Sequence, residues 1–178
     1  LEPSFRLQYY NTLGETSPEP RLGLKYNIND KTRFKAAGGL YSQNLLTTVN
    51  DRDIVNLFVG FLSGTDARVA DIAGGPNAFT KSRLQRSWHA VAGIERDITE
   101  KIDINLEGYY KDFTQLISLN RNKIEASDPD FRKETGVAYG IDLTAKYQGR
   151  NMYVWGAYSY ALVNRFDGVQ TYPPVFDR

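Results

Sequence analysis

The chain has 178 residues, a length typical of one domain, and its 22 basic and 21 acidic residues leave a formal charge of +1, which argues against a general nucleic-acid-binding protein. Cysteine is absent and His89 is the only histidine, so disulfides, thiolate metal sites and multi-histidine metal sites are excluded. No apolar run reaches the roughly 18 residues of a membrane helix, whereas transmembrane β-strands remain compatible because only alternate residues of such a strand need be apolar.

Apolar and polar residues alternate with a period of two along most of the chain, which is typical of strands with one apolar and one polar face. The alternation begins at Phe5 and Leu7 and is clearest in residues 101–115. A helix would scatter the charges of that segment around its circumference, so no helix is expected there. In chain order the predicted strands are residues 3–10, 20–28, 32–43, 86–98, 101–117, 135–148 and 151–164.

The expected connections alternate in length. Short polar turns at residues 29–31, 99–101 and 149–151 join neighbouring strands, whereas long connections cover residues 44–85, 118–134 and 165–178. This sorting is typical of outer-membrane barrels, which have short periplasmic turns and long extracellular loops. We therefore predict an all-β fold for residues 1–178: an antiparallel transmembrane β-barrel segment of about seven strands that forms part of a larger barrel.

The alternation also predicts which side chains share a face. The face expected to contact lipid carries Leu22, Leu24, Tyr26, Ile102, Ile104, Leu106, Ile141, Leu143 and Val154. The face expected to line the lumen carries Lys25, Lys35, Asp103, Asn105, Glu107, Asp142 and Lys146. Arg96 interrupts the apolar side near the end of its strand.

Residues that could carry chemistry have plainer structural explanations. His89 is predicted to lie on the polar face of a strand and to hydrogen-bond locally rather than to act as a catalytic base. Asp103, Asn105 and Glu107 share one strand face, but a flat strand spreads such ligands too far apart for one Ca²⁺ ion. Gly140, within a strand, is expected to mark a bend or the close approach of a neighbouring backbone. We therefore expect no enzyme, and no catalytic, cofactor-binding or metal-binding residue.

The longest expected loop contains an apolar stretch at residues 51–64. Asp51 or Asp53 could cap a short helix there, or the stretch could form a pair of strands. In either arrangement we favour a role in folding the loop on itself over a role in binding a partner.

Several segments, taken in order, resemble TonB-dependent outer-membrane receptors. The run RLGLKY at residues 21–26 looks like a barrel strand of that family, and GGLYSQ at residues 38–43 occupies the place of its next rising strand. Residues 87–96 and 106–111 are similar to later barrel hairpins, and residues 167–178 to a loop that leads to the next strand. The resemblance lies entirely in the barrel: the plug domain, the TonB-contacting box and the terminal strand of the family are not among these residues.

The resemblance implies a fold and a function. Receptors of this family have about 22 strands, so this chain would be the barrel portion of a cell outer-membrane receptor of a Gram-negative bacterium. The whole receptor would take up a nutrient, for which iron chelates, cobalamin, glycans and peptides all stay open. Its partners would be outer-membrane lipid, the remainder of the barrel and the plug, TonB through the plug, and a surface-exposed lipoprotein, with no cofactor and no nucleic acid.

Three alternatives belong to other classes. A complete small barrel with a structural or adhesive role would need an eighth strand, which residues 44–86 could supply. An outer-membrane hydrolase would need a Ser–His pair, for which His89 has no supporting motif. A soluble β-sandwich would pack its apolar side against a second sheet.

Overall fold

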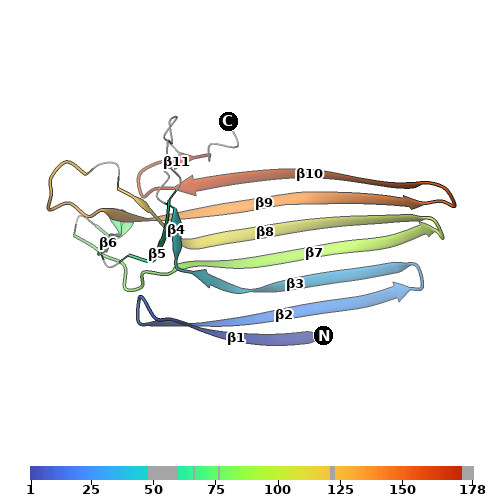
Figure 1. Ribbon diagram of the computed structural model, residues 1–178, viewed down its shortest axis with the longest axis horizontal. Helices are drawn as coiled ribbons and strands as arrows, with labels where there is room; N and C mark the ends of the chain where they lie inside the picture. The colour runs from blue at the N-terminus through green and yellow to red at the C-terminus, as the bar shows by residue number, and fades with distance from the viewer. Residues whose placement is uncertain (48–59, 66, 76, 121–122, 174–178) are drawn as a thin grey trace.

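One large antiparallel sheet dominates the computed structural model, which describes residues 1–47, 60–65, 67–75, 77–120 and 123–173. Its long strands are β1 (Glu2–Tyr10), β2 (Glu15–Asn29), β3 (Thr32–Gln43), β7 (Gln85–Thr99), β8 (Ile102–Leu119), β9 (Phe131–Gln148) and β10 (Tyr153–Phe166). They lie side by side in the order β1-β2-β3-β7-β8-β9-β10 (Figure 1). The prediction of an all-β, antiparallel fold is therefore confirmed. The sheet is open, because β1 and β10 do not pair with each other within the described residues.

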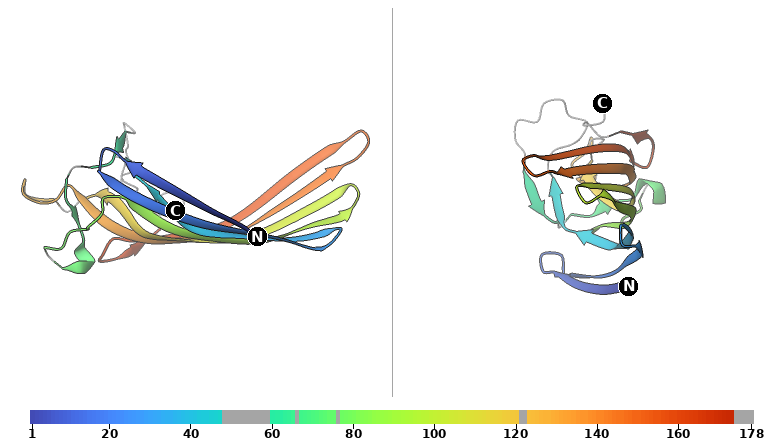
Figure 2. Two further views of the ribbon diagram at one scale, coloured as in Figure 1. Left: turned by 90° about the horizontal axis from the view of Figure 1, so that it is seen from below. Right: turned by 90° about the vertical axis from the view of Figure 1, so that its right-hand side faces the viewer.

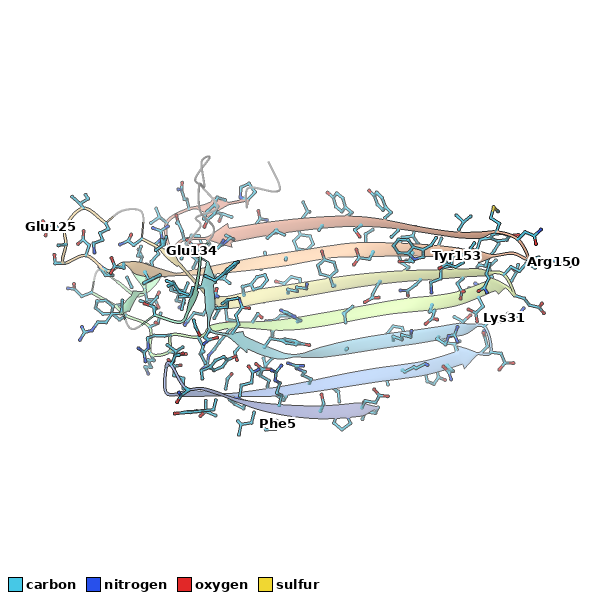
Figure 3. The ribbon with its side chains drawn as sticks, in the orientation of Figure 1. Phe5, Lys31, Glu125, Glu134, Arg150 and Tyr153 are labelled. Atoms are coloured by element: carbon cyan, nitrogen blue, oxygen red, sulfur yellow. The ribbon has the colours of Figure 1, made fainter. Side chains whose placement is uncertain are left out.

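Short polar turns gather at one end of the sheet, which we call the tight-turn end. Asn29 Oδ1 accepts a hydrogen bond from the Lys31 N–H at 3.0 Å, and Thr99 Oγ1 accepts one from the Lys101 N–H at 3.2 Å. Such side-chain bonds to the backbone two residues ahead are the reason why Asn and Thr favour turns. Lys31 and Arg150 mark this end in Figure 3.

The opposite end, which we call the loop end, carries the remaining elements. There β4 (Leu45–Thr47) and β5 (Phe61–Ser63) form a separate two-stranded sheet, which we call the β4–β5 hairpin. The short β6 (Val69–Ala70) pairs in parallel with β9, and β11 (Thr171–Tyr172) pairs with β10. A 3-10 turn, η1 (Ile72–Gly74), follows β6. Of the apolar segment at residues 51–64, residues 51–59 lie outside the described residues and Phe61–Ser63 is β5.

The first connection differs from the prediction, which began the second strand at residue 20. β2 begins at Glu15, so only residues 11–14 separate it from β1, and Gly14 takes the positive φ of 64° that this turn requires. Pro18 and Pro20 lie in the part of β2 that pairs with β1 alone, since the pairing with β3 begins at Arg21. A strand bonded on one side tolerates proline, because the missing N–H has no partner to lose. Not every connection at the loop end is therefore long.

The second of the three long connections is also shorter than predicted. β8 continues to Leu119 and β9 begins at Phe131, so the connection covers residues 120–130 rather than 118–134. The residues by which β9 exceeds its predicted length pair with the end of β8, from Leu116 opposite Glu134 to Leu119 opposite Phe131. A buried cluster of Leu46, Val69, Ile117 and Phe131 holds this extension against the loop-end elements.

The strand register separates the side chains into the two predicted faces. Residues directly opposite each other in an antiparallel pair share a face, and Leu24 is opposite Ala36, which is opposite Ala92. Continued across the sheet, the register places every residue of the predicted lipid-facing set on one face and every residue of the predicted lumen-facing set on the other. We call these the apolar face and the polar face.

The main sheet is a single twisted layer, and its hairpins fan apart at the tight-turn end (Figure 2). The accessible surface of the chain is 12015 Å², whereas a compact soluble monomer of 20.2 kDa exposes about 8,800 Å². The excess is what an uncovered sheet predicts. Apart from Ala138, the buried apolar residues lie towards the loop end, and the large apolar side chains of the strands are mostly exposed.

Candidate functional site

The apolar face is continuous across the sheet and has no second layer over it among the described residues. One row runs from Tyr26 through Phe34 and Ile94 to Leu106 and beyond. Leu106 in the middle of the sheet is 49% exposed and Ile141 beside it is 50% exposed. Soluble monomers rarely expose a contiguous apolar surface of this kind unless it contacts something else.

Two charged residues bound the part of the apolar face that carries no charge, and apolar side chains continue beyond Arg96 at Ile102 and Val154. Towards the loop end, Asp112 on β8 lies directly opposite Trp88 on β7. Towards the tight-turn end, Arg96 on β7 lies directly opposite Ile104 on β8. The row of Asp112 and the row of Arg96 are eight residues apart, which is about 27 Å along a strand. In a barrel whose strands are tilted by about 40°, this length spans about 21 Å along the barrel axis. Aromatic rings accompany the loop-side limit, where Trp88 lies 5.2 Å from Tyr110 between ring centroids. The dimensions approach the apolar band of about 25 Å, bordered by aromatic residues, that outer-membrane barrels carry.

The polar face carries an ordered set of ion pairs between strands. Arg33 on β3 reaches both carboxylate oxygens of Asp97 at 3.0 Å and Glu95 Oε1 at 3.2 Å, and Lys35 also pairs with Glu95. These side chains are a quarter to a half exposed. Partly exposed ion pairs are compatible with a wall that faces water, because each charge keeps part of its hydration.

His89 lies on the polar face, as predicted, and its ring contacts are local. Its Nε2 lies 3.0 Å from Ser87 Oγ, and its ring stacks on Tyr41 with centroids 4.3 Å apart. The Arg21 guanidinium lies over the Tyr41 ring, with its Cζ 4.4 Å from the ring centroid. The nearest aromatic neighbour on β8 is Phe113, in an edge-to-face arrangement at 6.2 Å. The group therefore forms an aromatic and cationic surface near the loop end.

Next to this surface, a cleft of about 610 Å³ opens between the polar face and the β4–β5 hairpin. We call it the hairpin cleft. Leu45 and Phe61 line it from the hairpin, and Phe113, Leu116 and Val163 line it from the sheet. Gln85 holds the hairpin over the sheet, because its Nε2 donates a hydrogen bond to the Leu45 carbonyl oxygen at 2.8 Å.

A β-bulge explains why the cleft is apolar although the face around it is polar. The register of β8 against β9 shifts between Phe113 and Leu116, so β8 contains one extra residue there. Without the shift Leu116 would lie on the face opposite to Phe113, whereas with it both side chains line the hairpin cleft. Gln115 stabilises the bulge by donating hydrogen bonds to the carbonyl oxygens of Ser82 and Leu84 at 2.7 and 2.8 Å.

A buried ionic network supports the loop end behind the cleft. Glu134 on β9 accepts hydrogen bonds from Ser118 Oγ and the Tyr172 hydroxyl, each at 2.6 Å, and pairs with Arg165 at 3.0 Å. Arg132 pairs with Asp167 at 2.6 Å. All carboxylate partners in this network are at most 4% exposed, so the charges are compensated within the protein. Figure 3 shows the position of Glu134 where the long strands meet the loop-end elements.

The pKa of Asp167 is well below its usual range. Burial alone would raise it, but the backbone N–H groups of Gln170 and Val169 and the Arg132 guanidinium lower the pKa to about 2. Asp167 lies beyond the end of β10, outside the strands that form the apolar face. Its carboxylate thus remains charged under all physiological conditions.

No local sequence pattern groups the residues of the hairpin cleft. Lys111 was visible only as one polar residue in an alternating strand, and Gln85 lay at the edge of a predicted loop. The signal that groups them is the bulge at residues 113–116, which no local pattern indicates. Among the described residues, no three metal-ligating side chains come together and no helix is long and apolar enough to cross a membrane.

Comparisons with known proteins do not assign a family. No protein-family model matches the chain, no curated protein matches it, and no solved structure matches it. The resemblance to TonB-dependent receptors therefore stays a prediction.

Proposed function

We propose that this chain is part of the wall of a transmembrane β-barrel in the outer membrane of a Gram-negative bacterium. The observation that carries the proposal is the uncovered apolar face, which has no charged side chain between the row of Asp112 and the row of Arg96. Outer-membrane lipid is the partner that covers such a band on all sides. The polar face, with its interstrand ion pairs, would line the lumen.

The open sheet supports a larger barrel over a complete small one. The outer edges of β1 and β10 do not meet within the described residues, and unpaired strand edges are not tolerated in lipid. Further strands must therefore pair with both edges. This arrangement is the one expected of the barrel portion of a TonB-dependent receptor, with a plug in the lumen, TonB acting through the plug and a surface-exposed lipoprotein at the loops.

We infer a transport rather than an enzymatic function. The loop end holds a preformed cleft that opens on the proposed lumen, which suits a receptor that captures a nutrient for uptake. His89 contacts Tyr41 and Ser87, and none of the ring contacts found among the described residues is with a carboxylate. A binding surface is therefore favoured over a catalytic one.

The medium on each face can be measured residue by residue because the chain contains no cysteine. Single cysteines at Leu24, Leu106 and Leu143 would carry a fluorescent label, and matched cysteines would replace their polar-face neighbours Lys25, Glu107 and Asp142. In vesicles that contain doxyl-labelled phospholipid, we expect strong quenching at the three leucine positions and weak quenching at the three polar positions. Equal quenching in the two sets, or protection of the leucine positions from lipid, would overturn the proposal.

A further inference from the structure

The hairpin cleft differs from its surroundings in charge as well as in polarity. Among the residues that the structure describes, its lining includes the cationic Lys111 and Arg165 but no aspartate or glutamate. The remaining lining is mostly aliphatic and aromatic, with the amides of Gln43 and Gln85 at the hairpin side. A cavity of about 610 Å³ lies within the usual range of about 300–1,000 Å³ for sites that bind small molecules.

Lys111 is the cation best placed to meet a ligand. Its Nζ lies 5.0 Å from the ring centroid of Tyr109, which also lines the cleft. Within the part of the chain that the structure describes, Lys111 takes part in none of the ion pairs of the polar face. Arg165 differs, because its guanidinium already pairs with Glu134 at 3.0 Å. An incoming anion would therefore gain most from Lys111.

The apolar surface near Lys111 favours a flat, aromatic body over a polar one. Phe61 from the hairpin and Phe113 from β8 line the same cleft, and Phe61 is 63% exposed. An exposed phenylalanine beside a preformed cavity offers apolar area that a ligand ring can cover, and aromatic pairs gain about 0.5–1.5 kcal/mol beyond the area they bury. Sugars, by contrast, need several convergent hydrogen-bonding side chains, and within the described part of the chain the uncharged polar residues that line the cleft are Gln43, Gln85 and Tyr109.

We propose that the hairpin cleft binds a small organic anion with an aromatic body, its carboxylate at Lys111 and its rings between Phe61 and Phe113. The inference rests on the proposed receptor function and narrows it, because it names the chemical class of the ligand. The β4–β5 hairpin is then part of the binding site rather than only a surface loop. Gln85 has a positioning role, since it holds Leu45 and the hairpin above the sheet.

The test uses 1-naphthoate as the probe and the complete polypeptide folded in detergent micelles. Binding is followed by titration calorimetry against 1-naphthamide, which has the same rings but no charge. We expect naphthoate to bind at least tenfold more tightly than naphthamide, and Lys111→Met to remove that preference. Phe61→Ala should weaken both probes, because it removes ring contact and leaves the charge in place.

Matched controls separate the cleft from the rest of the charged face. Lys25→Met removes one exposed lysine from the polar face towards the tight-turn end and should leave both affinities unchanged. Lys111→Arg should retain the preference for naphthoate, which shows that a loss in Lys111→Met is not a folding defect. Equal affinities for the two probes, or equal losses in Lys111→Met and Lys25→Met, would overturn the inference. Lipid quenching on the same samples reports the membrane proposal separately, so failure of one is distinguishable from failure of the other.

Discussion

The Nη2 atom of Arg132 lies 2.6 Å from Oδ2 of Asp167, and both side chains are about 95% buried. The other oxygen of Asp167 accepts hydrogen bonds from the N–H groups of Val169 and Gln170 at 3.0 and 2.9 Å. One carboxylate thus closes the turn between β10 and β11 and ties that turn to β9. The pair joins residues that lie far apart in sequence, and its partners leave Asp167 charged.

Stability at low pH should report this carboxylate. Its folded-state pKa of about 2 is below the usual value of 3.8, so its contribution is fully present above about pH 4 and is lost as the pH falls towards 2. The shift corresponds to about 2 kcal/mol. We expect Asp167→Asn to cost about 2–4 kcal/mol at pH 7, because it leaves the buried Arg132 without its anion. Urea unfolding from lipid vesicles at a series of pH values would measure both effects.

An exposed carboxylate provides the control for that measurement. Asp130 is 58% exposed and pairs with Lys123 at 2.7 Å, and such pairs contribute about 0–1 kcal/mol. Asp130→Asn should therefore lower the free energy of unfolding by less than about 1 kcal/mol. The variant should still lose stability as the pH falls from about 4 towards 2, as the native chain does. If Asp167→Asn lost the same amount of stability over this pH range as the native chain, the Asp167 carboxylate would not be the group responsible.

Two glycines on adjacent strands should respond oppositely to substitution by alanine. A Cβ at Gly140 would meet the backbone carbonyl oxygen of Tyr160 and would lie 2.9 Å from the Tyr109 hydroxyl, whereas a Cβ at Gly156 would meet nothing within 4 Å. We expect Gly140→Ala to destabilise the fold by about 1–3 kcal/mol. Gly156→Ala should be neutral or stabilising by up to about 1 kcal/mol, because it restricts the unfolded chain. Unfolding midpoints of the two variants under one condition decide the point, and equal effects would show that the close approach at Gly140 is unimportant.

Charge placed on opposite faces should have opposite consequences for membrane insertion. Leu106→Arg puts a cation in the middle of the apolar face and should cost about 2–4 kcal/mol in folding into lipid. Asp142→Leu removes a charge from the polar face at the strand position directly opposite Glu107, and it should be mild. Folding yields into vesicles over a urea series provide the measurement. Similar costs for the two variants would contradict the proposed facing.

Local alternation predicted the strands well, since the residues that decide each face lie two positions apart in the chain. Residues 101–117 were assigned to a strand from their own pattern, and β8 covers Ile102–Leu119. The start of β2 differs from the predicted start at residue 20, because Pro18 and Pro20 are tolerated in a strand only where β3 does not pair, and that pairing is not visible in the sequence. His89 was placed on the polar face by parity alone, but its stacking on Tyr41 depends on the pairing of β3 with β7.

The amino-acid sequence alone determined which side chains share a face, because a strand turns successive residues to opposite sides whatever it pairs with. Only the tertiary structure decided where that alternation fails and what results from the failure. The bulge at Phe113 and Leu116 depends on the registers of β7 and β9 against β8. The hairpin cleft, which both Phe61 and Phe113 line, and the pair of Arg132 with Asp167 likewise join segments that are distant in the chain. Such contacts are set by strand register and loop packing, and neither leaves a periodic signal in the sequence.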